Sequence, residues 1–240
     1  LNNSNLSGTN LRHTNLSGAD LSGVDLSNKD LTESNLSGVN LKNMDLTGII
    51  LSGVDLSNKD LTGTILTFAK LSGANLDGVD LSNKDLTRSN LSGVDLSNKD
   101  LTGTILTFAD LSGANLDGVD LRNKDLTGTV LSGVDLSGVN LRNVDLAGTI
   151  LSGVNLSNKD LTGTILTFAD LSGANLDGVD LRNKDLTGTV LSGVDLSGVN
   201  LRNVDLAGTI LSGVDLSNKD LTGTILTFAE LSGANLDGVD

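Results

Sequence analysis

Leu51-Ser52-Gly53-Val54-Asp55 is one copy of a five-residue unit that fills the whole chain. Leucine stands at position 1 and at every fifth position after it through Leu236, which gives 48 repeats. An α-helix places apolar residues at intervals of about 3.6, and a flat strand at intervals of about 2. A strict period of five fits neither, so it predicts a solenoid whose turn contains a whole number of repeats.

The other four positions of the repeat each have a restricted composition. The residue two before the leucine is mostly small or β-branched, and the next is mostly Asp or Asn. Two residues after the leucine stand all 29 glycines and 12 asparagines, which fill 41 of the 48 positions. Both residue types tolerate the positive φ that a type II turn requires at its third residue. Each repeat therefore predicts one extended piece and one corner, and four corners close a square coil with leucine and the small residue inside.

This motif resembles that of the pentapeptide repeat family: a small residue, Asp or Asn, Leu or Phe, then two variable residues. The resemblance covers the whole chain. It implies an all-β fold, a right-handed quadrilateral parallel β-helix solenoid of about 12 coils, each made of four repeats. The best-known members, quinolone-resistance proteins and a mycobacterial relative, are acidic rods that mimic DNA and bind DNA gyrase. Other members, many from cyanobacteria, have no assigned activity.

The repeats predict one solenoid domain over residues 1–240. Residues 1–40 are less regular, and residues 41–240 follow a superrepeat of three coils, or twelve repeats. Residues 101–160 and 161–220 are identical except for Asn155 against Asp215. Each superrepeat is expected to present the same surface, which suits a repetitive or extended partner. The chain begins at Leu1 rather than Met, so targeting is left open.

The composition argues against catalysis. The chain has no cysteine and one histidine, His13, so no arrangement of nucleophile, base and orienting group is visible. Glycines are spaced for corners rather than for phosphate binding, and zinc-ligand spacing is absent. We therefore expect no enzymatic activity, no cofactor and no metal. The net charge of −14 argues against direct binding of nucleic acid, and no apolar run of about 18 residues predicts a membrane span.

Two residue types break the expected pattern. Lysine occupies the inward small position eight times, always in the sequence Asn-Lys-Asp-Leu. An unpaired buried ammonium is costly, so we expect the stem to lie along the core edge and the charge to reach the corner; an internal cation relay is the alternative. Phenylalanine occupies four glycine positions, and because a bulky residue disfavours positive φ, a different turn is expected there.

Two surfaces are candidate interaction sites. We call the first the apolar ridge, where isoleucine or valine replaces the acid and phenylalanine replaces glycine: Ile65, Phe68, Ile105, Phe108, Val130, Ile150, Ile165, Phe168, Val190, Ile210, Ile225 and Phe228. It is either local packing of phenylalanine over isoleucine or a lateral interface. The second is an acidic face: Asp60, Asp80, Asp100, Asp120, Asp160, Asp180 and Asp220. It is a solvated face, a DNA-like surface for a basic protein, or a weak divalent-cation site.

These features together predict a non-enzymatic structural or protein-binding solenoid. The favoured hypothesis is a rod-like scaffold or spacer that binds a protein partner or associates with itself, laterally or end to end. The alternative is an acidic DNA mimic that binds and modulates a topoisomerase such as DNA gyrase. Against the alternative, the chain lacks the C-terminal dimerising element and projecting loop that quinolone-resistance members carry.

Overall fold

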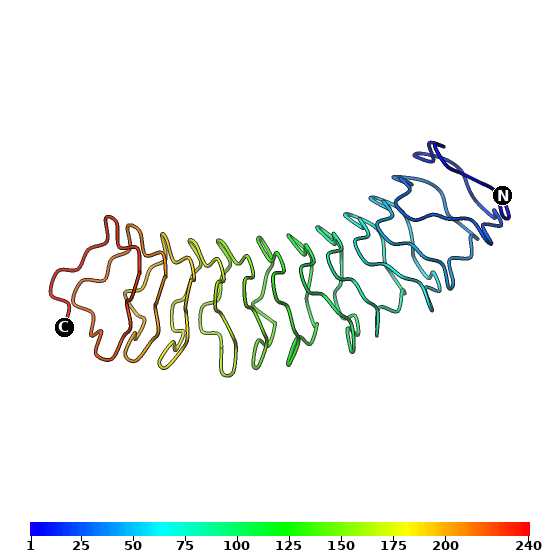
Figure 1. The fold of residues 1–240 in the computed structure, drawn as a ribbon. Coiled ribbons are helices and arrows are strands. Elements are labelled where there is room, and N and C mark those ends of the chain that lie inside the picture. The colour runs from blue at the N-terminus through cyan, green and yellow to red at the C-terminus, as the bar shows by residue number, and fades with distance from the viewer. The chain divides into compact units, whose positions relative to one another are not determined.

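The computed structural model describes residues 1–240 as two compact units, Leu1–Val119 and Asp120–Asp240. In Figure 1 the first unit runs from blue to green and the second from green to red, and each is a stack of coils. There is no helix, and strand pairing consists of single-residue parallel bridges rather than extended strands. No segment forms a membrane-spanning helix. One continuous domain over residues 1–240 stays a prediction.

Every bridge joins residues 20 apart in the sequence, as Asp55 and Asn75 illustrate. Each coil therefore contains four five-residue repeats, and the all-β solenoid is confirmed within each unit. The handedness and the total of about 12 coils stay predictions. We name the four faces by their acid positions: face A contains residue 5 and every twentieth residue after it, and faces B, C and D start likewise at residues 10, 15 and 20.

The corners have the expected turn. The carbonyl oxygen of Leu51 accepts a hydrogen bond from the amide of Val54 at 3.0 Å, and Gly53 between them has a φ of 66°. A one-to-four hydrogen bond with positive φ at the third residue is what a type II turn requires. The glycine and asparagine corners are thus confirmed, except at Gly138 and Gly198, which are not among the residues with positive φ although their corners keep the hydrogen bond.

The expectation of a different turn at the phenylalanine corners was wrong. All four phenylalanines adopt φ values of 59–61°, in the same left-handed region as glycine. The amide of Ala69 still bonds to the carbonyl of Leu66 at 3.1 Å, so the corner at Phe68 keeps its hydrogen bond. Buried leucines on both sides fix the path of the backbone. The conformational cost, about 1–3 kcal/mol, is smaller than the cost of displacing a leucine from the core.

The core is a ladder of leucines. Every leucine from Leu21 through Leu216 is at most 3% exposed. The small inward position is filled by residues such as Val54, and by Thr149, whose hydroxyl donates to the carbonyl of Leu146. No buried side-chain nitrogen or oxygen lacks a hydrogen-bond partner. Burial of each leucine contributes about 2 kcal/mol before the cost of chain entropy is subtracted.

Pairing between coils is uneven around the square. On face B, within each unit, every pair of neighbouring coils from residue 30 onward is bridged. On face D no bridge occurs, and the coil-to-coil backbone hydrogen bonds there are those of the terminal Asp240. Backbone groups that lack a neighbour must find other partners. Face D therefore depends on side chains for part of its backbone hydrogen bonding.

The lysines at inward positions supply some of these side-chain hydrogen bonds. On face D, Lys59 Nζ donates to the carbonyl oxygens of Leu36 at 2.7 Å and Val39 at 3.0 Å, both in the preceding coil. Lys159 contacts the carbonyl of Val139 in the same way, at 2.9 Å. The stems are part-buried, as expected, but the ammonium groups bond to backbone carbonyls instead of only extending outward at the corner. The sequence did not indicate that backbone carbonyls of the preceding coil receive the charge.

Candidate functional site

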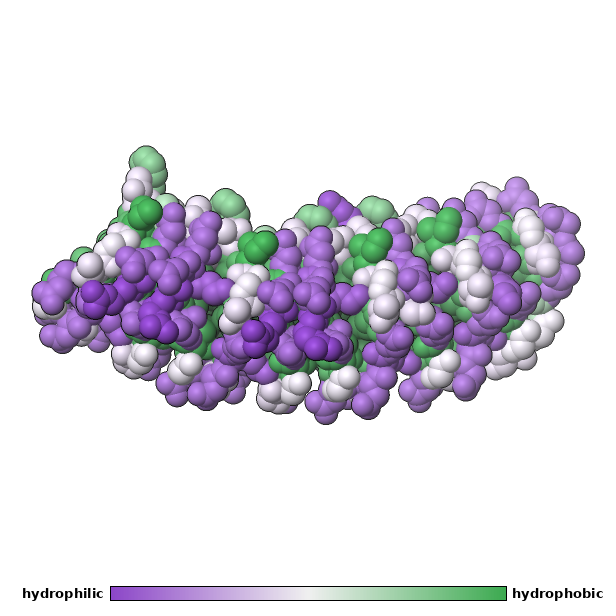
Figure 2. Space-filling view, turned by 90° about the horizontal axis from the view of Figure 1, so that it is seen from below, coloured by the Kyte–Doolittle hydropathy of each residue, from purple (hydrophilic) through white to green (hydrophobic).

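The apolar ridge lies on faces A and B and at the corner between them. Its face A isoleucines are 46–47% exposed, and its phenylalanines are 51%, 50%, 67% and 90% exposed in chain order. On face B, Ile150 is 37% exposed, and Val130, Val190 and Ile210 are half-buried. Figure 2 shows hydrophobic groups as separate green patches in a largely hydrophilic surface. Ridge residues of neighbouring coils meet on face B, where parallel bridges join Val130 to Ile150 and Val190 to Ile210.

Phenylalanine rings of the ridge contact residues of neighbouring coils, as Phe168 and Phe68 illustrate. The ring of Phe168 lies over Gly188, where an added Cβ would collide with it. Ile165 remains 47% exposed beside this ring. In the first unit the guanidinium carbon of Arg88 lies 5.9 Å from the ring centroid of Phe68 and 5.0 Å from that of Phe108. Local packing therefore leaves much of the apolar surface open to solvent.

The acidic face corresponds to face D, and its carboxylates first serve the backbone. Oδ1 of Asp60 accepts a hydrogen bond from the amide of Thr62 at 2.8 Å, and the other six members accept the equivalent bond at 2.8–3.0 Å. An asparagine oxygen does the same, as Asn140 shows with Arg142 at 3.0 Å. The free exchange of Asp and Asn in this position is explained by this shared role, which needs an oxygen but no charge.

Most of the acidic face is also paired with basic side chains. Salt bridges join five of the seven carboxylates to a Lys or Arg: Lys42–Asp60, Arg122–Asp120, Arg142–Asp160, Arg182–Asp180 and Arg202–Asp220. Hydrogen bonds from their arginines are the main cause that lowers the pKa of Asp120 and Asp180 to about 2. Lys42 is the main cause of the lowered pKa of Asp60. Face D is therefore largely charge-compensated.

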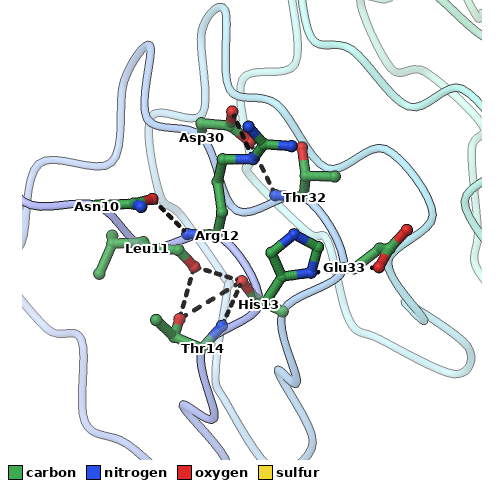
Figure 3. Close-up of polar contacts among 9 residues, drawn as sticks. Asn10, Leu11, Arg12, His13, Thr14, Asp30, Thr32 and Glu33 are labelled. Carbon is green, nitrogen blue, oxygen red and sulfur yellow. Dashed lines mark hydrogen bonds and ion pairs between the residues drawn. The ribbon is translucent and has the colours of Figure 1, made fainter.

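The less regular N-terminal coils hold the single histidine. His13 Nδ1 lies 3.2 Å from Glu33 Oε2, and both side chains are well exposed. Beside this pair, Arg12 Nε lies 3.4 Å from Asp30 Oδ2, as Figure 3 shows. The amide of His13 donates to the carbonyl of Thr32 at 2.9 Å, so these residues link two neighbouring coils. The cluster is a solvated set of coil-to-coil contacts.

The structure brings no three metal-ligating side chains into one cluster. The surface depressions on face D lie between neighbouring coils and are lined by residues such as Lys59, Asp60 and Asp80. They follow from the missing bridges on this face. Sequence reasoning also missed the stacking of Arg88. The sequence does contain a pattern that indicates this stacking, because the corner position equivalent to Arg88 holds a phenylalanine in each neighbouring coil, Phe68 or Phe108.

The family comparison agrees with the coil geometry. The sequence model described as pentapeptide repeats matches in eight copies, which cover residues 1–28, 14–53, 51–83, 85–123, 125–158, 151–183, 185–218 and 211–240. The chain belongs to the pentapeptide repeat family. This family consists generally of non-enzymatic structural or binding proteins. A comparison with curated protein sequences found no match.

Solved structures of other pentapeptide repeat proteins are similar to this one. HetL from the cyanobacterium Nostoc sp. strain PCC 7120, which is involved in heterocyst differentiation regulation, is 32% identical, with 84% of this chain and 86% of HetL covered and a TM-score of 0.29. Full-length QnrB1, a plasmid-mediated fluoroquinolone resistance protein, is 18% identical, with 95% and 91% covered and a TM-score of 0.31. A protein from the Arabidopsis thaliana thylakoid lumen is 29% identical, with 52% and 66% covered and a TM-score of 0.19.

Proposed function

We propose that this pentapeptide repeat protein is a scaffold or spacer that associates laterally through its apolar ridge. The observation that carries the proposal is the conformation of the four phenylalanines, which have φ values of 59–61° and are at least 50% exposed. A bulky L-residue in this region costs about 1–3 kcal/mol. Glycine or asparagine fills 41 of the 48 corners without that cost. A strained aromatic residue that leaves half or more of its surface in water supports a role in binding.

The isoleucines beside the phenylalanines strengthen the proposal. Ile105 and Phe108 belong to one coil, and the superrepeat returns the same pair as Ile165 with Phe168 and then as Ile225 with Phe228. Burying one such side chain completely contributes about 1.5–3 kcal/mol. Several partly exposed copies therefore offer enough apolar surface for a lateral contact.

The test is the molar mass in solution as a function of concentration, measured by light scattering or sedimentation. The matched variant replaces all four phenylalanines by asparagine, which occupies the same left-handed position elsewhere in the chain. We expect the mass of the natural sequence to rise with concentration and the variant to stay monomeric. If the natural sequence stays strictly monomeric, lateral association is contradicted. If the variant associates equally, the contact lies elsewhere, for example at the ends of the solenoid.

The alternative function, DNA mimicry toward a topoisomerase, is supported by the net charge of −14 and by the family. The paired carboxylates of face D weigh against it, because five of its seven acids already contact a basic side chain. A DNA gyrase supercoiling assay with no inhibition and no protection would remove this alternative.

A further inference from the structure

Four places in the structure share one local arrangement, which we call the corner site. Each consists of an aspartate on face A, the corner residue three positions later, and an isoleucine and phenylalanine in the next coil. A parallel bridge joins the aspartate to the isoleucine in all four. The sites are Asp45/Gly48/Ile65/Phe68, Asp85/Arg88/Ile105/Phe108, Asp145/Gly148/Ile165/Phe168 and Asp205/Gly208/Ile225/Phe228.

One corner site is filled by its own arginine. The guanidinium carbon of Arg88 lies 5.0 Å from the ring centroid of Phe108, within the range of a cation–π interaction. The acidic member of the site, Asp85, stands three residues before Arg88. At this site the corner residue, Arg88, therefore places its guanidinium on the phenylalanine ring of the next coil.

Two other corner sites have the same backbone but no side chain to fill them. Arg88 has a φ of 58°, and its amide donates to the carbonyl of Thr107 at 3.0 Å. Gly148 and Gly208 have φ values of 63° and 64°, and their amides donate to the equivalent threonine carbonyls at 2.9 and 2.8 Å. An added Cβ would meet nothing within 4 Å at Gly148 and only Gly188, at 4.0 Å, at Gly208. Both sites are therefore open to a group from outside.

The fourth corner site differs. The side chain of Asn28, in the preceding coil, lies over Gly48 and occupies the space that a Cβ would need. The open sites are thus the two in the second unit, at Gly148 and Gly208. Each has a half-buried carboxylate, that of Asp145 or Asp205, and the exposed phenylalanine of the next coil, Phe168 or Phe228, at the position where Phe108 meets Arg88. A guanidinium is the side-chain group that satisfies both, because it stacks on aromatic faces and pairs with carboxylates.

The same coils carry arginines on the opposite corner of face A. Arg142 shares a coil with Gly148, and Arg202 shares a coil with Gly208, so the two pairs are one superrepeat apart. Arg142 and Arg202 are 51% and 53% exposed, in salt bridges with Asp160 and Asp220. Exposed salt bridges contribute about 0–1 kcal/mol, so these arginines can exchange partners at little cost.

We propose that Gly148 and Gly208 receive Arg142 and Arg202 of a second copy of this chain. Two parallel copies can pack face A to face A about a twofold axis that runs along the solenoid. The corner that carries Arg142 and Arg202 in each copy then meets the corner that carries Gly148 and Gly208 in the other. The contact is then reciprocal, as a twofold interface requires. Ile165 and Ile225 meet their own counterparts at the centre. The face A aspartates of the second unit also face their own counterparts there, and the incoming arginine of the same coil supplies the compensating charge in each case: Asp125 with Arg122, Asp145 with Arg142, Asp185 with Arg182 and Asp205 with Arg202. This inference rests on the proposed lateral association and names its partner and contacts.

The decisive experiment uses two complementary double variants. Arg142→Gln with Arg202→Gln keeps the open sites but removes the incoming groups. Gly148→Arg with Gly208→Arg keeps those groups but fills the sites from within, as Arg88 does. We expect the dissociation constant of each variant alone to rise by about tenfold or more per lost site. An equimolar mixture should recover association, because one variant offers sites and the other offers arginines.

The matched control is Gly148→Ala with Gly208→Ala, because the added methyl group meets nothing within 4 Å at Gly148 and only Gly188, at 4.0 Å, at Gly208, and it adds no cation. It should associate like the natural sequence, and circular dichroism should show all variants folded. Suppose that both double variants, the one at Arg142 and Arg202 and the one at Gly148 and Gly208, associate as strongly as the natural sequence, while replacement of the four phenylalanines by asparagine abolishes association. That result would overturn this inference and leave the proposed function standing. Full association of every variant would overturn both. Binding of arginine-containing peptides without self-association would overturn the second copy as the occupant.

Discussion

The ammonium group of Lys59 donates a hydrogen bond to the carbonyl oxygen of Leu36, 2.7 Å away in the preceding coil. This contact lies on face D, where no bridge joins neighbouring coils. The lysine side chain thereby takes the place of a backbone donor. A residue that breaks the family motif thus stabilises the face with the weakest pairing.

Replacing Lys59 should separate the roles of its stem and its charge. Lys59→Ala removes both the part-buried stem and the bonds to Leu36 and Val39, so we expect the free energy of unfolding to fall by about 1–3 kcal/mol. Lys59→Met keeps an unbranched apolar stem and should lose less. Chemical denaturation of both variants measures the difference. An alanine variant as stable as the natural sequence would contradict this role.

The same lysine should make stability depend on alkaline pH. Burial lowers the pKa of Lys59 below its ordinary value of 10.5. The folded protein therefore releases this proton more readily than the unfolded chain, and the stability penalty of the charge disappears as pH rises through the folded pKa toward 10.5. We expect the free energy of unfolding of Lys59→Met to gain less over this range than that of the natural sequence. Equal slopes would show that Lys59 is fully solvated.

Acid should destabilise face D. Arg122 and Arg182 lower the pKa of Asp120 and Asp180 to about 2, from an ordinary value of 3.8. Because the folded pKa is the lower one, the stabilisation is present above 3.8 and is lost as pH falls toward 2. The melting temperature, followed by circular dichroism, should fall over this interval. Asp120→Asn with Asp180→Asn keeps the oxygen that accepts the backbone amide, so its melting temperature should fall less steeply.

Removing a strained phenylalanine should stabilise the monomer. Phe228 has a φ of 59° and is 90% exposed, so its ring contributes little packing. Asparagine adopts this conformation more readily, and we expect Phe228→Asn to raise the free energy of unfolding by roughly 0.5–1 kcal/mol. Thermal unfolding at low protein concentration, where association is negligible, measures the change. A loss of stability would mean that the ring packs on its own chain.

Hydrogen exchange should distinguish the faces of one coil. The amide of Leu71, on face B, donates to the carbonyl of Asn90 at 2.7 Å, whereas no backbone bond holds the amide of Leu61 on face D. Both leucine side chains are buried, at 1% and 3% exposure. We expect the Leu71 amide to exchange at least about tenfold more slowly. Equal rates would indicate that face D is paired in solution.

The sequence predicted those features that depend on one repeat. The five-residue period predicted the leucine ladder, and the glycines and asparagines predicted the corners, because each feature needs one residue type at one position. Features that depend on neighbouring coils were not predicted. The partners of Lys59 and the stacking of Arg88 follow from residues in other coils. The role of the acidic face stays a prediction, and its salt bridges, which join residues up to 18 positions apart, were not predicted.

The spacing of the bridges, one whole coil, also constrains how such a gene can grow. Copying a whole coil, or the three coils of the superrepeat, lengthens the protein and leaves every side chain on the face it occupied before. Copying a single repeat would rotate all following residues by a quarter turn and scatter the phenylalanines over different faces. Residues 101–160 and 161–220, which are nearly identical and three whole coils apart, therefore keep the same side chains on the same faces as well as the same fold.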